Sequence, residues 1–142
     1  MKLSRIALFV SMIVLATITS TQSAFALSRH EVASRKWRTE VRTQLKRHHI
    51  YSKARENTII NIIAHESTGR ENARNGVCVG LLQFNSGWKH NYSKHYFKKH
   101  HIKGYRQDNR LSGSWSIHRI VMVYKQGGSR AVQRHWKATY RR

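Results

Sequence analysis

Apolar residues recur at helical spacing through much of the chain. Between residues 27 and 49 they occupy every fourth position, at Ala33, Trp37, Val41 and Leu45, while basic side chains cover the other faces. A repeat of about four residues places side chains on one face of a helix. The pattern therefore predicts a first amphipathic helix over Leu27–His49 that packs through this stripe.

A second helix is predicted from Lys53 to about Ser67. Ser52 precedes it and can accept a hydrogen bond from the first turn. Gly69 follows it and suits the left-handed conformation in which many helices end. Glu66 shares a helix face with apolar side chains in the preceding two turns, which are Ile59, Ile62 and Ile63. We therefore expect this carboxyl group to point toward the core or toward a cleft beside it.

The second half of the chain predicts a long third helix over about residues 109–126. Asp108 is expected to cap this helix and Gly127-Gly128 to end it, before a short helix over 129–136. Residues 76–84 are compatible with a small hairpin, while 89–106 give the weakest indication of structure. With no internal repeat in its 142 residues, the chain is expected to fold as one mainly α-helical domain.

The first 26 residues have the pattern of a secretory signal peptide. Lys2 and Arg5 precede an apolar run over 6–18, and Ala24-Phe25-Ala26 provides a small-x-small cleavage site. The apolar run is too short for a comfortable membrane span. We expect residues 1–26 to be removed and 27–142 to form the secreted domain, in the periplasm or cell wall. An uncleaved anchor and an apolar first helix are the alternatives.

Charge narrows the range of partners. The chain has 27 Lys and Arg residues against six Asp and Glu, a formal charge of +21. Removing residues 1–26 takes away two basic residues and no acidic one, which leaves +19. Such an excess indicates a polyanionic partner. For an exported protein, anionic cell-envelope polymers fit better than nucleic acid, so we expect neither nucleic-acid binding nor stable membrane insertion.

Cysteine and histidine usage gives no indication of a cofactor. Cys78 is the only cysteine, so no disulfide can form within the chain. Four histidines lie close together at positions 90, 95, 100 and 101, but their spacing matches no common zinc motif. We expect no metal, no other cofactor and a monomeric protein.

Glu66 is the residue most suggestive of chemistry. Burial of a carboxyl group disfavours its charged form and raises its pKa. A carboxyl that keeps its proton near neutral pH can act as a general acid and protonate the departing oxygen of a glycosidic bond. The alternative is a structural role, in which Glu66 ends its helix and pairs with an arginine. Helical spacing alone leaves both open.

Three motifs follow in order from Glu66. The first combines ESTG at 66–69, NARN at 72–75 and VGLLQF at 79–84. The second is Asn109-x3-Gly113, and the third is VYKQGG at 123–128. In order and approximate spacing these motifs resemble the soluble lytic transglycosylase domain of the goose-type-lysozyme-like family. Lys125 stands where that family has asparagine, and residues 89–106 match none of its motifs.

The resemblance implies a lysozyme-like fold and cleavage of peptidoglycan glycan strands. Glu66 would protonate the oxygen between N-acetylmuramic acid and N-acetylglucosamine. It would then act as a base toward the muramic C6 hydroxyl, which gives a 1,6-anhydro product without water. Ser67 would support Glu66 or bind substrate, and Tyr124 would lie close to Glu66. The other substrate-binding residues implied are Gly80, Leu81, Leu82 and Gln83.

The number of carboxylates bears on the choice between lyase and hydrolase. Glycoside hydrolases normally use two carboxyl groups. Glu31, Glu40 and Glu56 are expected to be exposed on helices and Asp108 to act as a cap, which leaves Glu71 as the only candidate partner. We therefore favour a lytic transglycosylase. The alternatives are a lysozyme-type muramidase on the same fold and a non-catalytic, cationic wall-binding protein.

Overall fold

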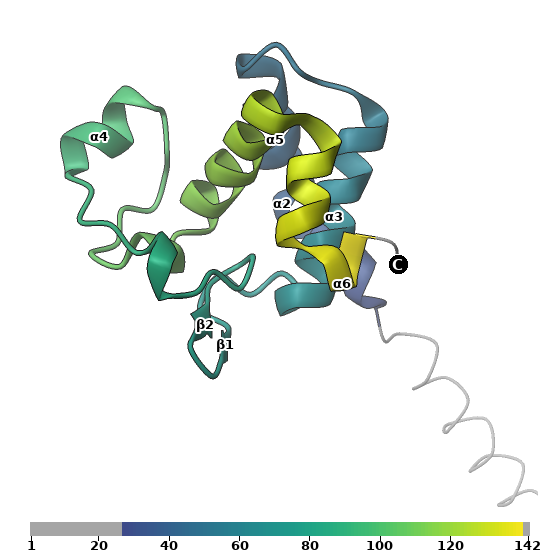
Figure 1. Ribbon diagram of the computed structural model, residues 1–142, viewed down its shortest axis with the longest axis horizontal. Coiled ribbons are helices and arrows are strands. Elements are labelled where there is room, and N and C mark those ends of the chain that lie inside the picture. The colour runs from purple at the N-terminus through teal and green to yellow at the C-terminus, as the bar shows by residue number, and fades with distance from the viewer. Residues whose placement is uncertain (1–26, 141–142) are drawn as a thin grey trace, which may run out of the picture.

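Figure 1 shows the computed structural model of the chain, which describes residues 27–140. It is mainly helical with a small two-stranded hairpin, so the prediction of one mainly α-helical domain is confirmed. The signal peptide expected at residues 1–26 lies outside the described residues. Between residues 27 and 140, none of the helices is both long enough and apolar enough to cross a membrane.

The fold is an assembly of three long helices with shorter elements at their ends. Helix α2 packs along α3, α5 packs against α2, and α6 returns to α3 (Figure 1). The hairpin and α4 lie in the connection between α3 and α5. In chain order the elements are α2 (Arg29–Arg47), α3 (Lys53–Ser67), β1 (Arg74–Asn75), β2 (Cys78–Val79), η1 (Ser86–Trp88), α4 (Lys94–Lys99), η2 (Asn109–Leu111), α5 (Gly113–His135) and α6 (Lys137–Tyr140).

Helix α2 buries the stripe that the sequence predicts. Ala33, Trp37, Val41 and Leu45 all belong to the core. The helix begins after Ser28, which forms a capping box with the glutamate three residues on. In it the serine hydroxyl accepts from a backbone N–H of the first turn, and the carboxylate accepts from the Ser28 N–H. Capping thus sets the start of α2 two residues later than the apolar pattern indicates.

Helix α3 has the predicted bounds and the predicted cap, since the Ser52 hydroxyl accepts a backbone hydrogen bond from the first turn. Thr68 is the first left-handed residue after the helix, with φ of 53°, and Gly69 follows with φ of 78°. A Cβ at Gly69 would lie 3.2 Å from Ala33 Cα. Gly69 therefore lets the end of α3 approach α2 closely, as well as ending the helix.

The long helix predicted from residue 109 is interrupted near its start. Residues 109–111 form the 3-10 turn η2, and Ser112 then caps α5 by accepting the Trp115 N–H. Helix α5 bends at Gly128, where φ is 64° and ψ is −164°. The predicted boundary at Gly127-Gly128 therefore corresponds to a kink. Beyond it, the chain runs back toward α3 and into α6 (Figure 1).

The connection between α3 and α5 contains the hairpin expected near residues 76–84. Arg74 pairs with Val79 in its antiparallel register. The following segment, 89–106, contains α4 and is held at its start by Asn109, which is fully buried. Asn109 Nδ2 donates to the Trp88 carbonyl over 3.0 Å, and Asn109 Oδ1 accepts from the His90 N–H over 2.6 Å. Asn109, the first residue of the Asn-x3-Gly motif, thus fixes the backbone at the start of segment 89–106.

Glu56 corrects one expectation, because the sequence predicts an exposed residue and the structure buries it completely. Its carboxylate accepts from Arg38 at 2.6 Å, from Arg42 at 2.8 Å and from Lys53 at 3.1 Å. The hydrogen bond from Arg42 is the main cause that holds the pKa of Glu56 well below its usual value. The three cations come from α2 and α3, so Glu56 joins the two helices through charge.

We predict that Glu56→Gln lowers the free energy of unfolding by roughly 2–3 kcal/mol, because three cations lose their shared carboxylate. The loss stays below that of a fully buried pair, since the Arg42 and Lys53 side chains are 42% and 63% exposed. Urea unfolding at neutral pH measures it. Glu31→Gln is the matched control, because glutamine preserves the capping box and should change stability by less than about 0.5 kcal/mol.

The pH dependence provides a second measurement on the same pair. A carboxylate with a depressed folded-state pKa stabilises the fold above its unfolded-state pKa of about 4.3 and loses this contribution as pH falls. The parent protein should therefore lose stability below about pH 4 more steeply than Glu56→Gln. Parallel acid profiles would contradict the role assigned to Glu56.

Candidate active site

Glu66 lies in the last turn of α3 and is half-buried. Burial is the main cause that raises the pKa of its carboxyl group, and a hydrogen bond from Thr139 and the charge of His65 oppose this rise. No described Lys or Arg forms an ion pair with Glu66. The described part of the chain thus provides no arginine partner for Glu66, and its carboxyl has the raised pKa expected of a general acid.

The C-terminal segment connects Glu66 to the loop that follows the hairpin. Thr139 Oγ1 donates to Glu66 Oε1 over 3.1 Å, and Trp136 Nε1 donates to the Leu82 carbonyl over 3.1 Å. The Trp136 indole also helps to line a pocket of about 220 Å³. Other residues around this pocket are Leu82, Gln83, Phe84 and Trp88. Two residues three positions apart in the C-terminal segment therefore contact Glu66 and the turn, while Glu66 itself is not among the residues that line this pocket.

The loop over Gly80–Phe84 is a tight turn. It is closed by a pair of hydrogen bonds between the backbones of Val79 and Phe84, each 3.0 Å long. Gly80 adopts φ of 89°, and a Cβ at this position would lie 1.8 Å from the Arg110 carbonyl oxygen. Only glycine avoids both the strained backbone and the clash. Gly80 therefore lets the turn sit directly on η2.

Gln83 is held in this turn with a left-handed backbone, φ 52°. Its Nε2 donates to the carbonyls of Gly80 at 2.8 Å and Ala73 at 3.2 Å. Its Oε1 is buried and has no hydrogen-bond partner among the described residues. A buried acceptor without a donor costs free energy, so this oxygen is a candidate contact for a hydroxyl or amide N–H of a ligand.

The side chains of Leu81 and Leu82 are buried in the core, as is that of Ser67. Any contact of Leu81 or Leu82 with a ligand must therefore come from the backbone. The Ser67 hydroxyl donates to the Ile63 carbonyl over 3.2 Å, one turn earlier in α3. The Ser67 hydroxyl is thus bound to the backbone of its own helix, and the described contacts include none between Ser67 and the Glu66 carboxyl.

Tyr124 lies at the other end of α3. The residue is buried, and the Arg55 guanidinium lies 5.9 Å from its ring centroid. Arg55 is in the first turn of α3, whereas Glu66 is 11 residues further along, or roughly 16 Å of helix. The described contacts therefore bring Glu66 together with Thr139, and they do not bring it together with Tyr124.

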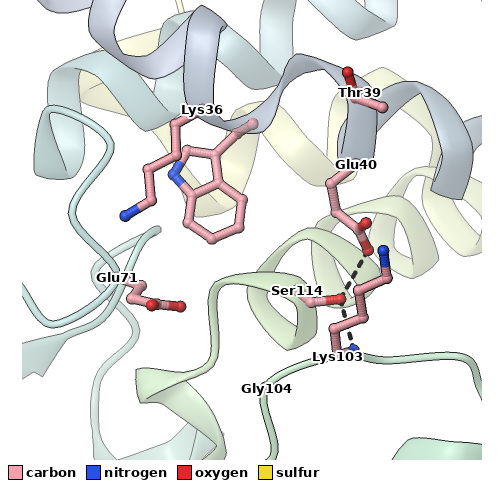
Figure 2. A pocket seen from close by; sticks show the side chains of 8 residues that line it. Lys36, Thr39, Glu40, Glu71, Lys103, Gly104 and Ser114 are labelled. Atoms are coloured by element: carbon pink, nitrogen blue, oxygen red, sulfur yellow. Dashed lines mark hydrogen bonds between the residues drawn. The ribbon is translucent and has the colours of Figure 1, made fainter.

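Glu71 lies in a different hollow, which Figure 2 shows from close by. This hollow of about 300 Å³ lies between α2 and the start of α5, beside Lys36 and Trp37. Glu71 Oε2 accepts from the Gly113 N–H over 3.0 Å and so stabilises the N-terminus of α5. Glu40 faces the same hollow and accepts from the Ser114 hydroxyl at 2.7 Å (Figure 2). Both carboxylates therefore have structural partners.

The remaining acidic residues are likewise occupied. Glu31 completes the cap of α2, Glu56 is surrounded by three cations, and Asp108 accepts from the Arg110 guanidinium at 2.8 and 3.0 Å. Asp108 caps the 3-10 turn η2, whereas the long helix that it was predicted to cap begins after Ser112. Within residues 27–140, burial raises the pKa of the Glu66 carboxyl, and the described hydrogen-bond partner of that carboxyl is the Thr139 hydroxyl.

No group of three or more His, Cys, Asp or Glu side chains in residues 27–140 is arranged to hold a metal ion. The Cys78 thiol is free and half-buried. The candidate site therefore consists of one carboxyl group, a hydroxyl, a tryptophan and a tight turn.

Sequence reasoning missed Thr139. Its contact with Glu66 joins residues 73 positions apart and depends on the kink at Gly128 and the turn into α6. No local pattern marks this residue. Trp136 lies in the core, and its indole N–H also donates to the Leu82 carbonyl.

Comparisons with protein-family models, curated proteins and solved structures gave no match. The resemblance of the motifs over 66–84, 109–113 and 123–128 therefore stands on the sequence, and the site geometry is the independent observation beside it.

We predict that Thr139→Val raises the pKa of Glu66 further, because it removes a hydrogen bond that favours the charged carboxylate. Titration of the Glu66 side-chain carboxyl carbon by NMR measures the change. Thr58→Val is the matched control, since the Thr58 hydroxyl donates only to the Ala54 carbonyl of α3. An unchanged Glu66 titration in Thr139→Val would contradict the contact.

Proposed function

We propose that this chain is a secreted peptidoglycan lytic transglycosylase in which Glu66 is the single catalytic acid. The observation that carries the proposal is the half-buried Glu66 carboxyl with its raised pKa and no cationic partner among the described residues. Such a group retains a proton to higher pH than an exposed glutamate and can deliver it to a glycosidic oxygen. The motif resemblance supplies the substrate class, the bond between N-acetylmuramic acid and N-acetylglucosamine.

The distribution of carboxylates favours the lyase over the hydrolase. A hydrolase needs a second carboxyl group to activate water or to attack the sugar. Glu71 was the only candidate for that role, and its carboxylate is bound to the Gly113 N–H at the start of α5. A lyase needs no second carboxylate, because the same group can return as a base and take the proton of the muramic C6 hydroxyl.

The turn over 80–84 is the proposed sugar contact. Its backbone is fixed by the Val79–Phe84 pair and by Gly80 against Arg110, so its amide groups are pre-organised. The unpartnered Gln83 Oε1 offers an acceptor to a sugar hydroxyl or an acetamido N–H. Trp88 and Trp136 line the adjoining pocket and provide aromatic surface for a sugar ring.

The predicted test is digestion of purified peptidoglycan by the mature protein, with products identified by mass spectrometry. We expect muropeptides with 1,6-anhydro ends. Glu66→Gln should lower their release by at least about 100-fold, in line with the contribution of a general acid. Activity should also fall as pH rises through the pKa of Glu66, because only the protonated acid acts. Because burial raises the pKa of Glu66, this loss of activity should occur at higher pH than it would for an exposed glutamate.

Glu71→Gln is the control, since glutamine can still accept the Gly113 N–H and activity should stay within about twofold. Reducing ends in place of anhydro ends would identify a muramidase. Undiminished lysis by Glu66→Gln would exclude the one-glutamate mechanism and would favour the non-catalytic wall-binding alternative.

A further prediction concerns retention on the wall. The charge of +21 on the full chain falls to +19 when residues 1–26 and their two basic side chains are removed, and it should hold the protein on anionic envelope polymers through screened electrostatics. The screening length falls from about 10 Å at 0.1 M salt to about 3 Å at 1 M. Inactive Glu66→Gln should therefore sediment with purified walls at low salt and be released at 1 M. Retention that is insensitive to salt would contradict an electrostatic attachment.

A further inference from the structure

A second pocket, remote in sequence from Glu66, is formed by a cluster of histidines. His118 on α5 lies between His48, which follows α2, and His100, which follows α4. The ring centroids are 5.4 Å apart for His48 and His118 and 5.5 Å apart for His100 and His118. Three elements therefore bring imidazole rings to one place.

These rings line a pocket of about 310 Å³, at the small end of the range for ligand sites. One wall is aromatic, with Tyr92 and Tyr96 stacked at a centroid distance of 4.2 Å. Lys125 and Arg119 stand at the same pocket. It thus combines aromatic surface, imidazole nitrogens and cations.

Two of the ring nitrogens in this pocket have no partner. His118 is 4% exposed, and its Nδ1 is buried without a hydrogen bond to any described residue. The same holds for Nε2 of His48. Buried polar atoms in folded proteins normally have a partner, in the protein or in bound water or ligand. Both atoms belong to residues that line this pocket, which makes a ligand bound there a candidate for the missing contacts.

The charged side chains that line the pocket are basic. No Asp or Glu lines the pocket. Burial is the largest cause that lowers the pKa of His118 to about 4, and His48, His100, Arg119 and Arg47 add to it. The pKa of His48 is also lowered, mainly by burial and next by the charge of Lys125. A bound anion would remove the repulsion among these groups.

The features that depart from the transglycosylase pattern meet here. Tyr92, Tyr96 and His100 belong to the segment 89–106, which matches none of the family motifs, and Lys125 replaces the asparagine of its third motif. The pocket is therefore a property of this chain that the resemblance does not explain.

We propose that this pocket binds a phosphate group carried by a small polyol or sugar unit, with His118, His48 and Lys125 as its donors. A phosphate offers several strong acceptor oxygens in a tetrahedral arrangement, which suits donors that converge from the end of α2 and from α5. A planar carboxylate would satisfy fewer of them. The aromatic wall accommodates the attached unit. The site is independent of Glu66 and does not rest on the proposed catalytic function.

The test uses the mature protein at physiological ionic strength, with NMR of the histidine ring protons. Glycerol 3-phosphate and poly(glycerol phosphate) are the probes, and acetate is the carboxylate comparison. We expect the phosphate probes to shift the His118 resonances and to raise the pKa of His118 well above its ligand-free value of about 4. If the polymer binds more tightly than the monomer, the natural source of the phosphate group is an envelope polymer. If the affinity per phosphate group is equal for the two probes, the source is a soluble phosphate ester.

The variants His118→Gln and His95→Gln form a matched pair, because His95 is exposed on α4 and outside the pocket. His118→Gln should weaken binding of glycerol 3-phosphate by at least about tenfold, while His95→Gln should bind as the parent does. If His118→Gln does not fold, Lys125→Met with Lys98→Met as control tests the same site. Unmoved His118 resonances, equal affinity of the paired variants, or acetate binding as strong as phosphate would overturn the proposal.

Discussion

The contacts of Trp37 hold the three long helices in register. Its indole N–H donates to the Gly69 carbonyl over 2.8 Å, which fixes the end of α3 against α2. The other edge of its ring lies on Gly113, where a Cβ would approach Trp37 Cη2 to 2.1 Å. One side chain of α2 therefore contacts the last residues around α3 and the first residue of α5. Glycine is a steric requirement at position 113, whereas at position 69 it is favoured by the positive φ of 78° and by the close approach to Ala33.

A shortage of negative charge is the second constraint on this fold. With six acidic residues against 27 basic ones, each carboxylate has a large number of available cations. Glu56 gathers three of them between α2 and α3, and Asp108 fixes Arg110 beneath the turn at residue 80. Glu66 has instead a hydroxyl donor and apolar surroundings. Among the described residues no Lys or Arg forms an ion pair with Glu66, and burial raises the pKa of its carboxyl.

Much of the fold could be predicted from the sequence because its helices have strong periodicity and clear ends. The stripe of α2, the cap at Ser52 and the break at Gly128 all depend on residues within a few positions of one another. Glu56 was predicted wrongly because nothing local shows that Arg38 and Arg42 approach it from another helix. Other features depend on contacts between segments that are distant in the sequence, namely the position of Thr139, the unpartnered oxygen of Gln83 and the histidine pocket. Glu66 could therefore be predicted as a candidate residue, whereas the residues around it could not.

The kink at Gly128 links the two halves of the candidate site. A straight α5 would carry residues 129–140 away from α3, and neither Thr139 nor Trp136 could reach its acceptor. Because the chain turns there with positive φ, the last residues come back along α3, one to the Glu66 carboxyl and one to the Leu82 carbonyl. The protonation of Glu66 and the position of the turn at 80–84 therefore depend on the same short segment. A change in that segment would alter the hydrogen bond to the Glu66 carboxyl and the pocket lined by Trp136 together.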